Sequence, residues 1–185
     1  MVTWLIILLI VIFVLLIVIW ATYNSLIRAR NNVENAWAQI DVQLKKRYDL
    51  VPNLLETVKG YMKHEKAVFT EITQLRSQAM QANDRGLAMK ANDKLTKAID
   101  GILNVAVENY PELKASQNFM MLQEELSGIE NKIAYSRQYF NDSVLSYNNK
   151  IQTFPSNIFA KMFGFKQKDF LEIPETEKAV PKVAF

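Results

Sequence analysis

The side chains that most often perform catalysis or bind metals are scarce in this sequence. Its 185 residues contain no cysteine and a single histidine, His64. The lack of cysteine excludes disulfides, thiolate metal ligands and cysteine nucleophiles. A zinc or copper site would need other imidazole or thiolate ligands beside His64, and the sequence supplies none. We therefore expect no metal centre and no cofactor.

Motifs for other common chemistries are also missing. The sequence contains no G-x-S-x-G nucleophile elbow, no glycine-rich phosphate loop and no paired Glu-x-x-His motif. The net charge of +3 is spread along the chain without a basic block, so nucleic acid is not an expected partner. The prediction is a protein that is not an enzyme and has no small-molecule substrate.

Charged residues inside apolar helical stripes are the most notable polar feature. Arg30 and Arg137 each occupy such a position, and a buried arginine needs a carboxylate partner. Internal pairing is the favoured interpretation, and a contact face for other helices or other copies is the alternative. The candidate polar interaction face comprises Arg30, Asp41, Gln43, Arg47, Asp49 and Arg137.

An uncharged apolar run opens the chain. Residues 1–27 carry no charged side chain, and the stretch from Trp4 to Trp20 is built from Leu, Ile, Val, Phe and Trp. A bilayer core about 30 Å thick needs roughly 20 apolar residues in a helix, and tryptophans favour its two interfaces. A cleaved signal peptide is disfavoured because no basic residue precedes the run and no A-x-A site follows it. The sequence predicts an uncleaved, single-pass transmembrane helix over residues 3–22.

Basic residues indicate the orientation of this anchor. None precedes the apolar run, whereas Arg28 and Arg30 follow it closely. The positive-inside rule then places the N-terminus outside and the C-terminal domain in the cytoplasm, at a bacterial inner membrane.

Helical periodicity continues beyond the anchor. Apolar residues at steps of three and four outline four segments, ending near Tyr48, Ala79, Ala106 and Phe154. Pro52 predicts a turn between the first two segments, and residues 83–86 predict another. The expected fold is all-α, with one N-terminal transmembrane helix that continues into an antiparallel up-and-down four-helix bundle. A long hairpin, with residues 23–83 kinked at Pro52 and residues 86–154 running back, is the competing architecture.

Three regions follow from this reading: an anchor at 1–22, a bundle at 23–154 and a C-terminal tail at 155–185. From Phe154 to Phe170 the chain combines five phenylalanines with three lysines. Two interpretations stay open, namely a cap on the bundle core and a segment at the lipid surface. The candidate membrane-interface residues are Trp4, Trp20, Phe159, Lys161, Phe163, Phe165 and Lys166.

Several stretches together resemble the LemA family of bacterial membrane proteins. They include Ala36-Trp37-Ala38-Gln39-Ile40-Asp41, the run from Val42 to Leu54, Glu108-Asn109-Tyr110-Pro111 and Gly164-Phe165. One departure is Phe140, because an asparagine is expected directly after Tyr139. The resemblance implies one N-terminal transmembrane helix, a soluble four-helix bundle and a place in the bacterial envelope. It supplies no catalytic residues.

The leading functional hypothesis is a non-enzymatic, membrane-anchored scaffold that self-associates or gathers other membrane proteins. The lipid bilayer and a homo-oligomer are its expected partners. A rival hypothesis is a ligand-binding or enzymatic bundle with a polar site built from Asp41, Arg47, Asp49 and Glu56. Such a site would gather these groups in one pocket. An adaptor for a membrane signalling partner is a third possibility.

Overall fold

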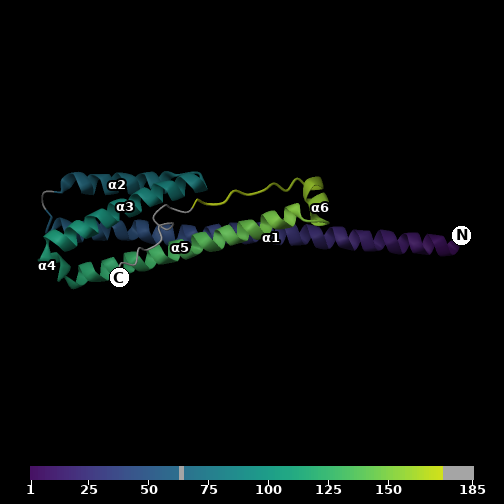
Figure 1. Ribbon diagram of the computed structural model, residues 1–185, viewed down its shortest axis with the longest axis horizontal. Coiled ribbons are helices and arrows are strands. Elements are labelled where there is room, and N and C mark those ends of the chain that lie inside the picture. Colours follow the sequence, from purple (N-terminus) through teal and green to yellow (C-terminus); the bar gives the residue numbers. More distant parts are fainter. Residues whose placement is uncertain (63–64, 173–185) are drawn as a thin grey trace, which may run out of the picture. The chain divides into compact units, whose positions relative to one another are not determined.

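The computed structural model describes residues 1–62 and 65–172. His64, discussed above as a lone histidine, lies outside these ranges. Within them no residue is in a β-strand, and the predicted all-α class is confirmed. The helices are, in order, α1 (Val2–Lys59), α2 (Lys66–Gln81), α3 (Arg85–Asn109), α4 (Pro111–Lys114), α5 (Gln117–Gln152) and α6 (Ser156–Met162) (Figure 1).

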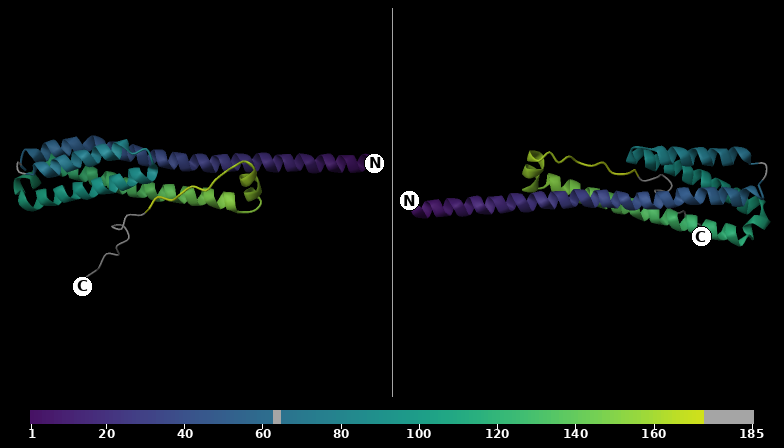
Figure 2. Two further views of the ribbon diagram at one scale, coloured as in Figure 1. Left: turned by 90° about the horizontal axis from the view of Figure 1, so that it is seen from above. Right: turned by 180° about the vertical axis from the view of Figure 1, so that it is seen from behind.

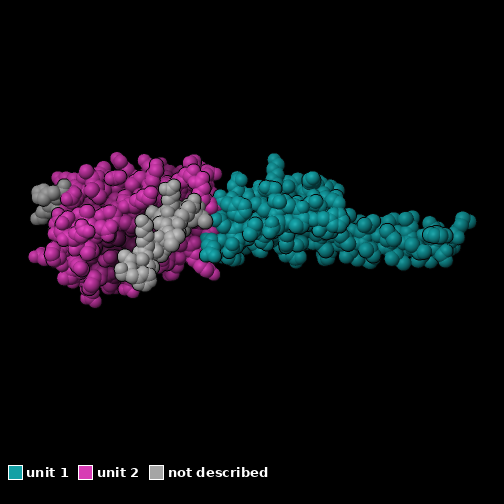
Figure 3. Space-filling model, in the orientation of Figure 1, with its two compact units in different colours: residues 1–39, 138–170 teal, residues 40–137, 171–185 magenta. Residues whose placement is uncertain are grey.

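The chain divides into two compact units, and α1 and α5 contribute to both. Unit 1 comprises Met1–Gln39 and Gln138–Phe170, and unit 2 comprises Ile40–Arg137 together with the chain from Leu171 onward (Figure 3). The division into an anchor, a bundle and a tail at residues 22 and 154 is a division by expected role, and it stays a prediction.

Unit 2 is the four-helix bundle. Figures 1 and 2 show α2 and α3 running alongside the adjoining parts of α1 and α5. Each of the four helices buries apolar side chains, because each presents them at helical spacing. Fully buried examples are Val51 and Leu54 of α1, Ile72 of α2, Leu95 and Ile102 of α3, and Phe119 and Ile133 of α5.

The boundaries of α3 and α5 follow the predicted signals. The turn predicted at residues 83–86 separates α2 from α3. Asp84 caps α3, since its carboxylate oxygen accepts a hydrogen bond from the Leu87 amide at 3.0 Å. The helix ends at Asn109, before Pro111, and α5 ends at Gln152, before Pro155.

The turn predicted at Pro52 is wrong. Helix α1 passes through Pro52 and continues to Lys59, so Leu54 and Val58 belong to α1 and not to the second segment. The helical break lies between Lys59 and Lys66 instead. The alternative hairpin, which needs one helix from 23 to 83 kinked at Pro52, is also not the observed architecture.

A hydrogen bond from another helix explains how α1 tolerates this proline. Pro52 has no amide proton, so it leaves the carbonyl of Tyr48 without its usual intrahelical donor. The Nε of Arg76 in α2 donates to that carbonyl at 2.6 Å. The proline therefore does not break the helix, because a neighbouring helix supplies the missing donor.

Unit 1 joins two helices and a returning segment. Leu26 and Val33 of α1, together with Phe140 and Val144 of α5, are buried in it. Phe140, the departure from the family pattern, packs edge-on against Trp37 with ring centroids 5.8 Å apart. After α6, the chain returns along α5 in extended form (Figure 2).

Side chains of α5 hold this returning segment. The Tyr147 hydroxyl donates to the Lys166 carbonyl at 2.9 Å. The Asn148 amide donates to the Lys168 carbonyl at 2.9 Å and accepts from the Lys168 amide at 3.0 Å. A hydrogen-bonded pair of this kind fixes the segment to α5 at one register.

The Pro52 arrangement predicts coupling between two substitutions. Arg76→Met should lower the free energy of unfolding by about 1–3 kcal/mol, because the part-buried Tyr48 carbonyl loses its donor. In a Pro52→Ala background the same change should cost about 1 kcal/mol less, since the amide at position 52 then supplies the bond. Urea unfolding of the full chain in detergent, followed by circular dichroism, measures all four variants. Additive effects would contradict this account.

Candidate functional site

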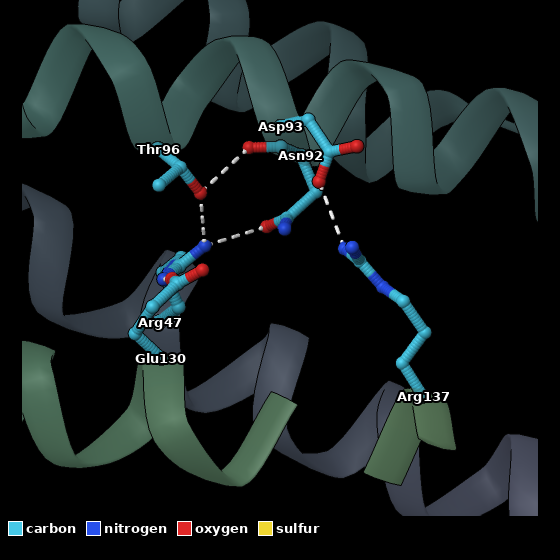
Figure 4. A network of polar contacts seen from close by, with 6 residues as sticks. All are labelled: Arg47, Asn92, Asp93, Thr96, Glu130 and Arg137. Atoms are coloured by element: carbon cyan, nitrogen blue, oxygen red, sulfur yellow. Dashed lines mark hydrogen bonds and ion pairs between the residues drawn. The ribbon is translucent and has the colours of Figure 1, made fainter. Parts of the chain in front are cut away.

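A buried arginine network occupies the centre of unit 2. Arg47 of α1 is 3% exposed. Its Nη1 donates to Asn92 Oδ1 at 3.1 Å and to Thr96 Oγ1 at 2.7 Å, and its Nη2 forms an ion pair with Glu130 of α5. One guanidinium thus joins α1, α3 and α5 (Figure 4).

The surroundings of Arg47 lower the pKa of its guanidinium, but the group stays protonated. Burial lowers the pKa of Arg47 to about 10, while Asp100 and Asp93 oppose the shift. Arg47 therefore stays a cation at physiological pH. Burial also raises the pKa of neighbouring Tyr48 to about 12, so its phenol stays neutral there.

Arg137 of α5 forms a second buried pair beside the first. It is 3% exposed, and its Nη2 lies 2.8 Å from Asp93 Oδ1 of α3. Figure 4 shows it reaching the same stretch of α3 as Arg47 does. The internal pairing expected for Arg137 is confirmed, and its effect is to hold α5 against α3.

A polar crevice opens next to Arg47. It has a volume of about 370 Å³, and Asp100, Asn104, Gln123 and Glu130 contribute to its walls. Burial raises the pKa of the Asp100 carboxyl, against the opposing effect of Arg47. Arg47 and Glu130 pair with each other at the edge of the crevice.

The other predicted polar residues are less buried than Arg47 and Arg137. Asp41 and Asp49 are exposed, and Gln43 is half-buried. Arg30 is exposed as well, and its guanidinium carbon lies 5.7 Å from the centre of the Phe165 ring, so the burial expected for Arg30 is wrong. An exposed arginine can still interact with an aromatic face at little desolvation cost.

The rival polar site is not assembled. Arg47 faces the interior of the bundle, whereas Asp41, Asp49 and Glu56 are exposed on α1. Glu56 pairs locally with Lys59, at 2.7 Å. The three carboxylates lie on one side of α1 and Arg47 on another, so the four groups of this hypothesis do not gather in one place.

An aromatic-basic cluster in unit 1 brings together several predicted interface residues. Phe163 and Phe165 pack edge-on against Tyr23, with ring centroids at 4.9 and 6.1 Å. The chain enters this cluster through a Schellman motif that ends α6. Its two bonds run from the Gly164 amide to the Lys161 carbonyl at 3.2 Å, and from the Phe165 amide to the Ala160 carbonyl at 2.9 Å.

The remaining predicted interface residues lie in the same unit. Phe159 is half-buried, while Lys161 and Lys166 are exposed. Trp4 and Trp20 project from α1 and are 75% and 70% exposed. Phe163 and Phe165, which contact Tyr23, thus partly cover the end of the packed helices, as the first interpretation expects. Basic and apolar side chains of α6 stay at the surface.

Sequence reasoning missed the partners of the buried arginines. Asn92, Asp93, Thr96 and Glu130 were not singled out beforehand. Asn92 is fully buried at a stripe position between Ala88 and Leu95. A buried asparagine needs hydrogen bonds, so its place in the apolar stripe was the available signal.

Comparison with known proteins identifies the family of this chain. The sequence profile of the LemA family matches residues 36–185. The chain belongs to the LemA family. It is 28% identical to Protein LemA of Metamycoplasma hominis over 156 residues, which cover 84% of this chain and 71% of that protein.

More distant relatives of this LemA-family chain carry another name. Magnetosome protein MamQ of Magnetospirillum gryphiswaldense is 23% identical over 80% of the chain. Magnetosome protein MamQ 2 of Paramagnetospirillum magneticum is 21% identical over 81% of it. The chain spans 64% of the length of each of these two proteins.

The arginine network predicts unequal effects of removing its two charges. Glu130→Gln leaves the buried Arg47 cation without its ion-pair partner. Loss of one partner of a fully buried pair costs about 3–5 kcal/mol, and we expect about 2 kcal/mol here because water can compensate part of the loss. The Glu130 side chain is 38% exposed, which is the reason for this reduction.

Removing the arginine together with its buried amide partner should cost less. The double variant Arg47→Met/Asn92→Leu replaces the buried charge and the buried amide by apolar side chains and leaves Glu130 accessible to water, so the expected loss is about 1 kcal/mol or less. Urea unfolding of the full-length variants measures the difference. A larger loss for this double variant than for Glu130→Gln would contradict this account of the network.

Proposed function

We propose that this chain is a non-catalytic assembly protein that is anchored in a bacterial cell membrane and self-associates there. The observation that carries the proposal is the exposed apolar part of α1. This helix is long and apolar enough to cross a membrane, and the side chains of residues 1–18 are all exposed. A helix that is apolar on every side needs a lipid environment or a protein partner.

The polar interior of unit 2 supports a non-catalytic role. Arg47 and Arg137 bind carboxylates of the same bundle, and these charges join helices to each other. Among the described residues, no three histidine or carboxylate side chains gather in a way that could hold a metal ion. Assembly needs only a stable bundle with an available outer face.

The outer surface of α5 offers such a face. Met121, Gly128 and Tyr135 recur every seven residues, opposite the buried side of the helix. Met121 and Tyr135 are 61% and 72% exposed. A Cβ added to Gly128 would meet nothing within 4 Å, so a second helix could approach closely there. Heptad spacing of this kind suits side-by-side packing of two helices.

Arg28 and Arg30 favour a cytoplasmic bundle with the N-terminus outside, at the inner membrane where the cell has two. The names of the magnetosome relatives are compatible with a membrane-bound assembly role. Under the same proposal an adaptor for a signalling partner would differ only in what it gathers.

The aromatic-basic cluster predicts a second contact with the membrane. Tyr23 follows the apolar run directly, and it holds Phe163. Ile158 and Met162 of α6 are 56% and 60% exposed. We propose that this helix lies at the lipid surface, where exposed apolar and basic side chains favour the interface.

A fluorescent probe tests this contact, because the chain has no native cysteine. Met162→Cys labelled with an environment-sensitive dye should be quenched by lipids that carry a spin label near the headgroup. Met120→Cys in unit 2, at a methionine 50% exposed, is the matched control and should not be quenched. Equal quenching at both positions, or none at position 162, would refute the lipid contact.

Self-association is tested by native mass spectrometry of the full-length protein in detergent. We expect dimers or larger assemblies, and Tyr135→Glu should shift them towards monomer because it places a charge in the α5 face. Met80→Glu alters an equally accessible apolar side chain of α2, which is 54% exposed, and should leave the assembly unchanged. A strictly monomeric protein with no copurifying partner would overturn the proposed function.

A further inference from the structure

An apolar groove lies between α2 and α3 in unit 2, separate from the arginine network. Its volume is about 540 Å³. Val68 and Leu75 of α2 and Ile102 and Val105 of α3 line its apolar part. At Gly101 an added Cβ would meet nothing within 4 Å, so the floor of the groove is open. A groove of this size is an unfilled binding surface for apolar side chains.

Lysines mark one end and one rim of this groove. Lys94 and Lys97 of α3 line it. Lys90 lies one helical turn before Lys94, and the spacing of 90, 94, 97, 101 and 105 puts these residues on one face of α3. Lys90 therefore stands one helical turn before Lys94, the first α3 residue that lines the groove, and the groove runs from there towards the C-terminal end of α3.

The end of the described chain reaches this same face. The Glu172 carboxylate lies 3.4 Å from Lys90 Nζ, and the preceding Leu171 is buried. Both residues belong to unit 2, as does the groove. Residue 172 therefore lies near the Lys94 end of the groove, immediately before residues 173–185.

The composition of those last residues suits the groove. Residues 179–185 are Ala-Val-Pro-Lys-Val-Ala-Phe. Valine and phenylalanine side chains would fill the apolar floor. Glu175 and Glu177 match the lysines of α3, and Lys178 and Lys182 match Glu65 and Glu71, which also line the groove. The family profile also extends over these residues, to position 185.

Length permits this occupancy. The part of α3 that lines the groove, from Lys94 to Val105, rises about 17 Å at 1.5 Å per residue. An extended chain from 173 to 185 can span about 40 Å. The C-terminal residues can therefore cover the whole groove even if their first half serves only as a connection.

We propose that the C-terminal segment, residues 179–185, binds in the groove between α2 and α3 of the same molecule. It adds a peptide to the surface of the bundle, with Val180, Val183 and Phe185 against the apolar floor. An intramolecular ligand needs little affinity, because the tether raises its effective concentration to the millimolar range.

Disulfide trapping tests the proposal in the full-length protein in detergent, since the chain has no native cysteine. The test pair is Ala184→Cys with Val105→Cys, which lies in the groove. The control pair is Ala184→Cys with Asn104→Cys, one position away but on the wall of the other crevice. Docking should make the test pair form its intramolecular disulfide about tenfold faster, because only that pair is held near each other.

Two results would overturn the proposal. Equal rates for the two pairs would mean that the segment does not select the groove. Disulfides found only between two molecules would assign the groove to the segment of another copy. Filling the groove with Gly101→Trp, in the background of the test pair, should reduce its rate to that of the control. Circular dichroism establishes that this variant folds, and the comparison of the two pairs stands without it.

Discussion

The buried charge of Arg47 is the constraint on which unit 2 depends. A cation that is 3% exposed must be surrounded by acceptors, and one helix cannot supply them all. Asn92 and Thr96 of α3 and Glu130 of α5 meet this need. The three helices must therefore keep one register relative to one another, and Arg137 with Asp93 repeats the requirement two turns further along α5. Apolar packing alone would allow the helices to slide more freely.

The two units solve different problems with the same two helices. In unit 2, α1 and α5 share an apolar core with α2 and α3, and buried ion pairs specify how they pack. In unit 1 the short α6 and the extended chain after it pack beside α1 and α5 in place of α2 and α3. Hydrogen bonds from the side chains of Tyr147 and Asn148 to the backbone hold the extended chain in position. The aromatic contacts of Tyr23 with Phe163 and Phe165 complete that unit beside the end of the apolar run.

Much of the fold could be predicted from the sequence, because its signals are local. The uncharged run, the apolar periodicity, the capped turn at Asp84 and the stops at Pro111 and Pro155 each act over a few residues. Pro52 misled for the opposite reason, since the donor that rescues its helix is Arg76, on another helix. Only part of the arginine network could be predicted from the sequence. Arg137 stands out as a charge in an apolar stripe, whereas Asn92 and Glu130 gain their roles only from tertiary contacts. Arg30 shows that the same stripe pattern also occurs at an exposed position.

The proline in α1 gives one position along this helix an exposed backbone acceptor. A regular helix hides its backbone polar groups, so it presents nothing but side chains to its neighbours. Pro52 uncovers one carbonyl, that of Tyr48, and Arg76 binds it. This hydrogen bond favours one position of α2 along α1. A residue usually regarded as a helix breaker thus helps here to fix the register of α2 relative to α1.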